Sequence, residues 1–505
     1  MSGKVIKSVV VSLMFCIALA ASAASPSAVF EKVKSVGDSV CTVSESVEMS
    51  NGVAIVYFTL KPEAVCDIKC RIALPPADKW NGEFWGEGNS SFGGVLPKVY
   101  AFARVTGAAV ATTDLGTSAY ITGTGWKKDV PAAVMRDYLW RATHLMTVYG
   151  KRITKAFYGR AARRAYFRGG SCGGRQGLSE AMDFPEDYDG IISSIPAAFM
   201  AVTSAQFINL FKQTHDEKGR ALFTREQLRV VADAPIEYMK DREPKPYAGK
   251  ILVNPFFSEQ DIEGFLKLAA KKDPSLADPD LQRRLKNIFM GVKRNGKTVC
   301  HGMTPGAFFG FKRGRSFEDR GALMMTLRNR RLGTFKNLPS WEIHDDEYAR
   351  NGRYLNKSST DLSAFRKRGG KLIVLCGLED QTTPCPEMIA WYEMLAEKNG
   401  GFEETAKFCR FFALPGQAHG GGKGRVGTGA GYTYNHLNLL RKWVDDGKAP
   451  EAYPQYWREE KLSIPVPPYP MMTYQDESGN WKTKRYPEGM VRHPDPFYME
   501  CVRLP

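Results

Sequence analysis

The hydrophobic pattern of the chain alternates between short apolar runs and longer amphipathic stretches. The apolar runs, typical of buried strands, lie at residues 53–74, 108–113, 188–196, 369–377 and 408–414. The stretches with helical spacing lie at residues 132–149, 384–396 and 434–445. Because strands and helices alternate along the chain, the sequence predicts an α/β fold around a mostly parallel sheet.

The pattern changes between residues 197 and 340, where helical and irregular segments dominate. Basic residues are frequent there, as in residues 312–315 and 328–331, and strand signals are few. We interpret the basic runs as solvated faces and the segment as an inserted, lid-like domain. The sequence thus predicts one catalytic domain made of residues 24–196 and 341–505, with a lid at residues 197–340.

The first 23 residues have the pattern of a cleavable signal peptide. Lys4 and Lys7 precede an apolar run at residues 9–20, and Ala21-Ser22-Ala23 forms a small-x-small cleavage site. The run is too short for a membrane anchor, and no later stretch is long enough to span a bilayer. The sequence therefore predicts a protein that is exported to a periplasm or secreted.

The net charge excludes few classes of substrate or partner. Without Lys4 and Lys7, 68 of the 70 basic residues stand against 54 acidic ones, a net charge of +14. These charges are spread along the chain, which favours solubility over a preference for anionic substrates such as aromatic carboxylates. No nucleic-acid partner is expected for an exported chain of this kind.

Nine cysteines remain once the signal peptide is removed, so at least one is free or pairs between chains. Cys66 and Cys70, and likewise Cys376 and Cys385, are close enough in the sequence to bridge locally. The connectivity is left open by the sequence.

The strongest chemical motif lies at residues 167–177, where a strand meets a glycine turn and then a helix. Gly169-x-Ser171-x-Gly173 there fits a nucleophile elbow, whose glycines allow close backbone approach in a strained turn. The following helix would direct its N–H groups at a developing oxyanion. Gly170 to Gly174 fits the same template around Cys172, and a thiol is intrinsically the better nucleophile. The motif alone leaves both nucleophiles open.

An acid and a base follow in the order that a doubly wound hydrolase requires. Asp380 comes four residues after the strand that ends at Cys376, and His419 lies in a glycine-rich loop after the next strand. Both positions are at strand carboxyl ends, where such sheets place their sites. The alternatives are helix capping for Asp380, with Glu379 as the competing acid, and a structural role for His419. The other late histidines, His436 and His493, lie on a helix and in the tail.

Several separated blocks between about Cys66 and Pro470 resemble the tannase and feruloyl esterase family. They are the elbow with residues 175–177, 184–185 and 188–191, the loop at residues 80–94, the run at residues 361–373, and residues 414–419. The resemblance implies an α/β-hydrolase fold with a lid and hydrolysis of phenolic-acid esters. It also implies that Ser171, rather than Cys172, is the nucleophile, with Asp380 as acid and His419 as base.

The chain departs from that family at informative positions. Gly170 and Gly420 occupy the places where the family usually has a disulfide that joins the nucleophile and histidine loops. Residues 240–251 lack the spaced aspartates of the family's calcium loop, so we expect no calcium site there. We also predict no metal ligands among the site residues and no cofactor. Ser90 and Ser91 replace glycines in the upstream loop. We assign the oxyanion hole to the backbone N–H groups of Cys172 and Ser90.

The sequence thus predicts an exported serine carboxylic-ester hydrolase whose partner is a small aromatic ester of the hydroxycinnamate or gallate type. Ser171, His419 and Asp380 would act through an acyl-enzyme. One rival prediction is a thiol hydrolase that uses Cys172. The other is a non-catalytic binding protein on a hydrolase scaffold, which the altered oxyanion loop and the lost disulfide and calcium loop would fit.

Overall fold

The computed structural model describes most of the chain outside its two ends and two internal stretches. The described residues are 25–122, 125–126, 130–218, 220–254, 256–294, 297–305, 359–383, 385–419, 435–458 and 460–486. The predicted signal peptide and the predicted lid boundary at residue 340 lie outside them. Within this part of the chain, no helix combines the length and the apolar character needed to cross a membrane.

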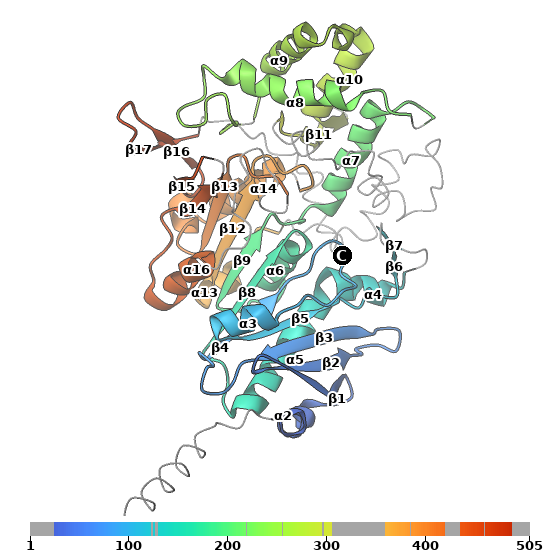
Figure 1. Cartoon of the computed structure of the whole chain (residues 1–505), viewed down its shortest axis with the longest axis vertical. Helices are drawn as coiled ribbons and strands as arrows, with labels where there is room; N and C mark the ends of the chain where they lie inside the picture. The colour runs from blue at the N-terminus through green and yellow to red at the C-terminus, as the bar shows by residue number, and fades with distance from the viewer. Residues whose placement is uncertain are drawn as a thin grey trace, which may run out of the picture.

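A nine-stranded mixed sheet runs through the centre of the molecule (Figure 1). Its spatial order is β1-β2-β3-β5-β4-β8-β9-β12-β13. The strands are β1 (Cys41–Ser50), β2 (Val53–Leu60), β3 (Ile68–Leu74), β4 (Glu83–Glu87), β5 (Ala109–Thr113), β8 (Arg164–Gly170), β9 (Gly190–Ser194), β12 (Lys371–Gly377) and β13 (Cys409–Leu414). Pairing is antiparallel from β1 to β5 and parallel from β5 onward, so the carboxyl ends of β8, β12 and β13 share one edge.

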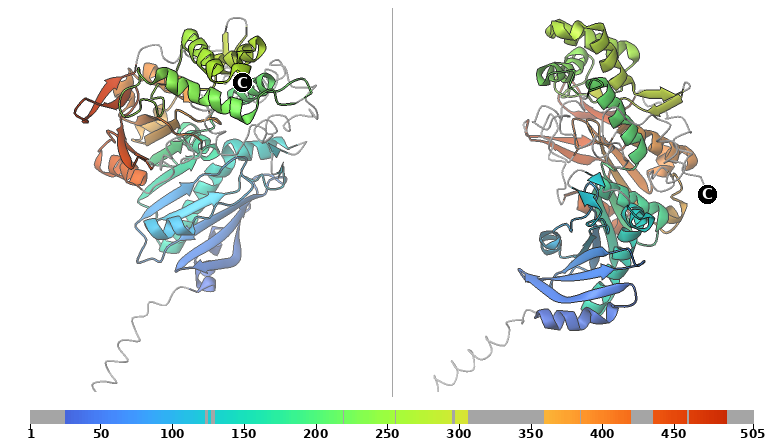
Figure 2. Two further views of the ribbon diagram at one scale, coloured as in Figure 1. Left: turned by 45° about the horizontal axis from the view of Figure 1, so that its top comes forward. Right: turned by 90° about the vertical axis from the view of Figure 1, so that its right-hand side faces the viewer.

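Helices cover the sheet on both faces, as the edge-on view of Figure 2 shows. The helices are α2 (Pro26–Val33), α3 (Tyr100–Thr106), α4 (Ala132–Arg136), α5 (Ala142–Tyr158), α6 (Cys172–Asp183), α13 (Ser363–Lys367), α14 (Cys385–Lys398), α15 (Phe402–Thr405) and α16 (Asn435–Asp446). A Cβ at Gly190 of β9 would contact Leu440 of α16. A Cβ at Gly177 of α6 would contact Ile191, the next residue of β9. Because consecutive strand residues face opposite sides, α6 and α16 cover opposite faces of β9.

The predicted elements are present, with differences that have local causes. Residues 53–74, which the sequence predicts as strand-like, form the two antiparallel strands β2 and β3. The helix predicted at residues 132–149 is divided by a π-helical turn at Asp137–Arg141 and continues to Tyr158. Strand β1 was not predicted, because only a few of its positions are buried and its apolar alternation is weak. The tail forms two small hairpins, β14 (Tyr453–Trp457) with β15 (Leu462–Val466) and β16 (Met471–Gln475) with β17 (Trp481–Arg485).

A second hydrophobic core lies in the region above the sheet in Figure 1. It is built by α7 (Met200–Thr214), α8 (Arg225–Met239), α9 (Glu259–Lys272) and α10 (Pro279–Met290), beside the hairpin β10 (Val292–Arg294) and β11 (Lys297–Cys300). Leu210, Phe265 and Phe289 are among its buried side chains. Tyr247 and Ile251 from the same segment pack into the main core instead. Helices dominate the described residues of this segment.

The eight cysteines of the described residues are all buried free thiols. Neither local bridge that the spacing allows, Cys66–Cys70 or Cys376–Cys385, is formed. The main core is therefore held by packing across the sheet rather than by cross-links within the described chain.

Candidate active site

Ser171 occupies a strained turn between β8 and α6. Its φ of 59° and ψ of −116° lie in a backbone region that side-chain-bearing residues rarely adopt. The end of β9 holds the turn in place. The Ser171 N–H donates to the Ser194 carbonyl at 3.0 Å, and the Ala197 N–H donates to the Ser171 carbonyl at 2.9 Å.

The glycines on either side of Ser171 are required by close backbone contacts. A Cβ at Gly169 would lie 2.5 Å from the carbonyl carbon and oxygen of Gly173, and one at Gly173 would lie 2.9 Å from the Asn89 carbonyl oxygen. Rigid backbone groups at such distances leave no room for a methyl group. The structure therefore supports the reading of this turn as an elbow.

Ser171, His419 and Asp380 form a hydrogen-bonded chain. The Nε2 of His419 lies 3.0 Å from Ser171 Oγ, and its Nδ1 lies 2.8 Å from Asp380 Oδ2 and 3.0 Å from Asp380 Oδ1. Each side chain follows the carboxyl end of a parallel strand, namely β8, β12 and β13. The sheet therefore brings together residues that are 248 positions apart in the sequence. Such a chain can move a proton from the hydroxyl to the imidazole.

Asp380 is buried and held by several donors. The backbone N–H groups of Thr382 and Thr383 donate to its Oδ1 at 2.7 and 2.8 Å, and the Thr383 hydroxyl donates to its Oδ2 at 2.7 Å. Gln381 accepts the His419 N–H through its side-chain oxygen at 3.1 Å. The sequence analysis did not identify Thr383 or Gln381. A hydroxyl residue three positions after an aspartate is the available signal, because this spacing closes a local side-chain turn.

The Cys172 thiol contacts Arg175, one turn further along the same helix. Its Sγ accepts a hydrogen bond from Arg175 Nη2 at 3.3 Å, and the residue is only 2% exposed. Arg175 is itself fully buried, donates to the carbonyls of Leu139 and Tyr138, and lies over the Tyr138 ring. Because the thiol is buried beside Arg175, His419 bonds to the Ser171 hydroxyl rather than to the neighbouring thiol.

The upstream loop is fixed against the elbow through Asn89. The Gly173 N–H donates to the Asn89 carbonyl at 2.8 Å, and the Asn89 N–H donates to Gln176 Oε1 at 2.8 Å. The Asn89 side chain also donates to the Thr113 carbonyl at 2.6 Å. Ser90, the next residue, is thereby placed beside the start of α6. No residue in the described ranges accepts a hydrogen bond from the backbone N–H of Ser90 or Cys172.

The alternative candidates for the acid and the base lie elsewhere or contact other residues. Both carboxylate contacts of His419 come from Asp380 rather than Glu379. His436 is buried on α16 near the Tyr453 hydroxyl, and burial, followed by the charge of Arg168, lowers the pKa of His436 to about 4. His493 lies outside the described residues.

The mixed sheet, the strained elbow and the helices on both faces define an α/β-hydrolase. Solved structures share this fold. Feruloyl esterase B from Aspergillus oryzae aligns with a TM-score of 0.74 over 91% of this chain and 100% of that one, at 22% identity. Tannin acyl hydrolase from Aspergillus niger aligns with a TM-score of 0.71 over 96% of this chain and 97% of that one, at 15% identity.

The sequence comparisons identify the family. The profile of the family described as tannase and feruloyl esterase matches residues 53–239 and 325–484. A probable feruloyl esterase B-2 from Aspergillus flavus is 29% identical over 414 residues, which cover 74% of each chain. One from Aspergillus terreus is 27% identical over 85% of this chain and 80% of its own. The chain belongs to the tannase and feruloyl esterase family and is a carboxylic ester hydrolase.

Proposed function

We propose that the protein is an exported serine esterase that hydrolyses aromatic esters through Ser171, His419 and Asp380. The single observation that carries the proposal is the continuous chain of hydrogen bonds from Asp380 through His419 to the Ser171 hydroxyl. An imidazole in this position accepts a proton near neutral pH, and a carboxylate behind it fixes the tautomer and stabilises the imidazolium.

The reaction would proceed in two halves. His419 Nε2 takes the hydroxyl proton as Ser171 Oγ attacks the ester carbonyl, and the tetrahedral intermediate collapses as His419 returns the proton to the leaving alcohol. A water molecule, deprotonated by the same imidazole, then attacks the acyl-enzyme. Its proton goes back to Ser171 Oγ, which releases the carboxylic acid and restores the enzyme.

The oxyanion would be stabilised by the backbone N–H groups of Cys172 and Ser90. Cys172 is the first residue of α6, so its N–H points out of the helix at the positive end of the helix dipole. The Asn89 contacts fix the backbone next to Ser90. Because both groups lack a described acceptor, an oxyanion would not have to displace an existing bond.

Aromatic esters are the substrate class that we propose. The relatives are named feruloyl esterases and a tannin acyl hydrolase, names that refer to hydroxycinnamoyl and galloyl esters. We place substrate recognition in a lid at residues 197–340, and the separate hydrophobic core formed by α7 to α10 supports an inserted unit there. Export rests on the leader pattern of residues 1–23 in the sequence.

The test compares two adjacent substitutions on a panel of esters that includes methyl ferulate, methyl gallate and a p-nitrophenyl ester. We expect Ser171→Ala to lower kcat by at least about a thousandfold and to abolish labelling by a fluorophosphonate probe. Cys172→Ala keeps the backbone N–H and should retain most of the activity. Iodoacetamide should inhibit the wild-type enzyme weakly, because the thiol is buried.

Two results would contradict the proposal. Loss of activity in Cys172→Ala but not in Ser171→Ala would make the protein a thiol hydrolase. Wild-type protein that neither reacts with the probe nor cleaves any ester on the panel would indicate a different reacting group or substrate class.

A further inference from the structure

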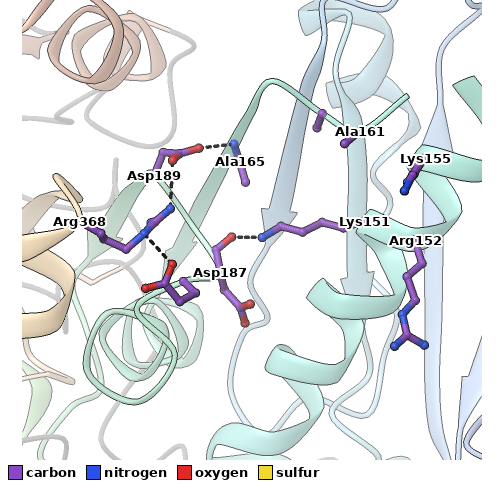
Figure 3. A pocket seen from close by; sticks show the side chains of 10 residues that line it. Lys151, Arg152, Lys155, Ala161, Ala165, Asp187, Asp189 and Arg368 are labelled. Carbon is purple, nitrogen blue, oxygen red and sulfur yellow. Dashed lines mark hydrogen bonds and ion pairs between the residues drawn. The ribbon is translucent and has the colours of Figure 1, made fainter. Parts of the chain in front are cut away.

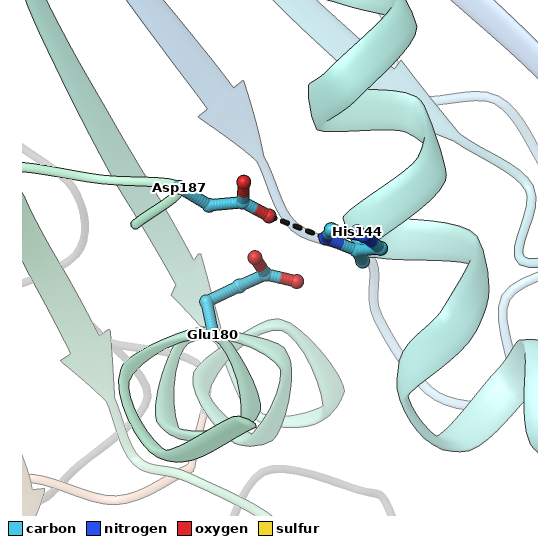
Figure 4. A group of neighbouring side chains, drawn as sticks. All are labelled: His144, Glu180 and Asp187. Carbon is cyan, nitrogen blue, oxygen red and sulfur yellow. Dashed lines mark hydrogen bonds and ion pairs between the residues drawn. The ribbon is translucent and has the colours of Figure 1, made fainter. Parts of the chain in front are cut away.

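Three side chains whose atoms could bind a metal ion lie near the C-terminal end of α6, whereas Ser171 precedes its first residue. His144 on α5, Glu180 on α6 and Asp187 before β9 each offer one ligand atom, and these atoms lie within 4.8 Å of one another. Figure 4 shows the three side chains converging from three separate elements. Glu180 is nine residues after Ser171, so the cluster is about 14 Å along the helix from Ser171.

Glu180 provides the second, independent indication of a ligand. Its side chain is completely buried, and neither carboxylate oxygen has a hydrogen-bond partner in the structure. Buried carboxylates are almost always paired, because an isolated buried charge is very unfavourable. A bound cation would give both oxygens the partner that they lack.

The side chains of His144 and Asp187 are positioned by contacts with their neighbours, and both are partly exposed to solvent. His144 stacks on the Phe184 ring at a centroid distance of 3.9 Å, and its Nδ1 lies 2.7 Å from Asp187 Oδ2. The His144 side chain is 28% exposed and that of Asp187 is 11% exposed. Asp187 also lines a cavity of about 320 Å³ with Lys151, Glu186 and Arg368 (Figure 3). Solvent therefore reaches the cluster from this side.

We propose that His144, Glu180 and Asp187 bind one divalent first-row transition cation of the zinc class. Imidazole with two carboxylates suits zinc, whereas calcium and magnesium prefer oxygen ligands alone. Two carboxylates neutralise the ion, and a water molecule from the open side completes four-coordination. Ligand atoms in a tetrahedral zinc site are about 3.4 Å apart, so side-chain shifts of about 1 Å would form it.

The ion would tie α5 and α6 to the segment that leads into β9. Helix α6 begins at the elbow and β9 holds the elbow through Ser194, so the cation would stabilise the scaffold behind Ser171. Its position away from Ser171 Oγ makes it a structural ion rather than a participant in ester hydrolysis. This role does not depend on which ester the enzyme cleaves.

The experiment measures metal binding in the untagged full chain after removal of metal with a chelator. We expect one equivalent of Zn²⁺ by elemental analysis and calorimetry, a higher Tm with Zn²⁺ present, and a visible absorption band when Co²⁺ is bound instead. Glu180→Gln keeps the shape and removes the charge, and should weaken Zn²⁺ binding by about 100-fold or more.

His215→Gln is the matched control for His144→Gln. His215 also stacks on a phenylalanine, Phe211, at 4.0 Å, but it has no place in the cluster. We expect His144→Gln to lose Zn²⁺ binding and His215→Gln to keep it. The proposal is overturned if the wild type binds less than one equivalent of Zn²⁺, if Ca²⁺ binds more tightly, or if both histidine variants bind alike. In the first case the cluster is a proton-sharing group in which Glu180 is neutral.

Discussion

The Thr383 hydroxyl is expected to control activity although it does not contact the ester. It donates to Asp380 Oδ2 at 2.7 Å, on the same oxygen that bonds to His419 Nδ1. Its other contacts within the described residues are longer, at 3.3 Å to the Ile195 carbonyl and 3.4 Å to His419 Nδ1, so we assign its one proton to Asp380. Thr383→Val removes this donor with almost no change in side-chain shape.

The magnitude follows from the donors that remain. A hydrogen bond to a charged group contributes about 1.5–3 kcal/mol, and the two backbone N–H groups on Oδ1 stay in place. Part of this lost free energy destabilises the resting enzyme and the transition state equally, and that part does not raise the activation barrier. We therefore expect kcat to fall by about tenfold, equivalent to about 1.4 kcal/mol, with little change in KM.

The assay is steady-state hydrolysis of a soluble aromatic ester at 25 °C, where each variant is verified to be folded. Thr383→Ser restores the hydroxyl and should recover kcat to within about threefold of the wild type. Thr382→Val is the matched control, because Thr382 donates only its backbone N–H to Asp380. Wild-type kcat in Thr383→Val, or an equal loss in Thr382→Val, would refute the assignment of Asp380 as the carboxylate that supports His419.

Two further predictions concern the elbow and the pH dependence of stability. Gly169→Ala places a methyl group against the Gly173 backbone and should lower stability by about 1–3 kcal/mol in denaturant titrations, with a larger loss of activity. Gly37→Ala is the control at an exposed turn with φ of −61°, where the nearest backbone atom would lie 3.3 Å from the new Cβ rather than 2.5 Å; it should lower stability less and leave activity unchanged. Burial raises the pKa of Glu243 to about 7. The folded state therefore keeps its proton while the unfolded state loses it, and stability falls as pH rises from about 4.5 to 7. Glu243→Gln should be more stable than the wild type by about 3 kcal/mol at pH 8 and equal to it near pH 4, whereas a pH-independent difference would contradict this reasoning.

The predicted export places the free thiols in an oxidising compartment. In an oxidising compartment, exposed thiolates would react, but the described cysteines are all buried. Burial raises the pKa of Cys41 and of Cys66 to about 12, so little thiolate forms at neutral pH. Buried thiols of this kind are compatible with an exported protein that lacks disulfides among them.

The sequence predicted most strands and helices of the main sheet, and it named the three side chains that the structure joins by hydrogen bonds. Apolar runs identified the parallel strands, because burial on both faces leaves a continuous hydrophobic signal. The glycines around Ser171 marked the turn, since only they permit the contact between Gly169 and Gly173. The order of nucleophile, acid and histidine then followed from the positions of loops after strands. Strand β1 was missed because its mixed burial leaves little periodicity.

The contacts that distinguish neighbouring side chains are visible only in the tertiary structure. Ser171 and Cys172 fit the same local pattern, and only packing shows that Arg175 contacts the thiol while His419 contacts the hydroxyl. The cluster at His144, Glu180 and Asp187 had no sequence signal at all, because its members come from three elements. A sequence pattern reports how each residue meets its neighbours along the chain. Which distant side chains meet is set by the order of the strands and the packing of the helices upon them.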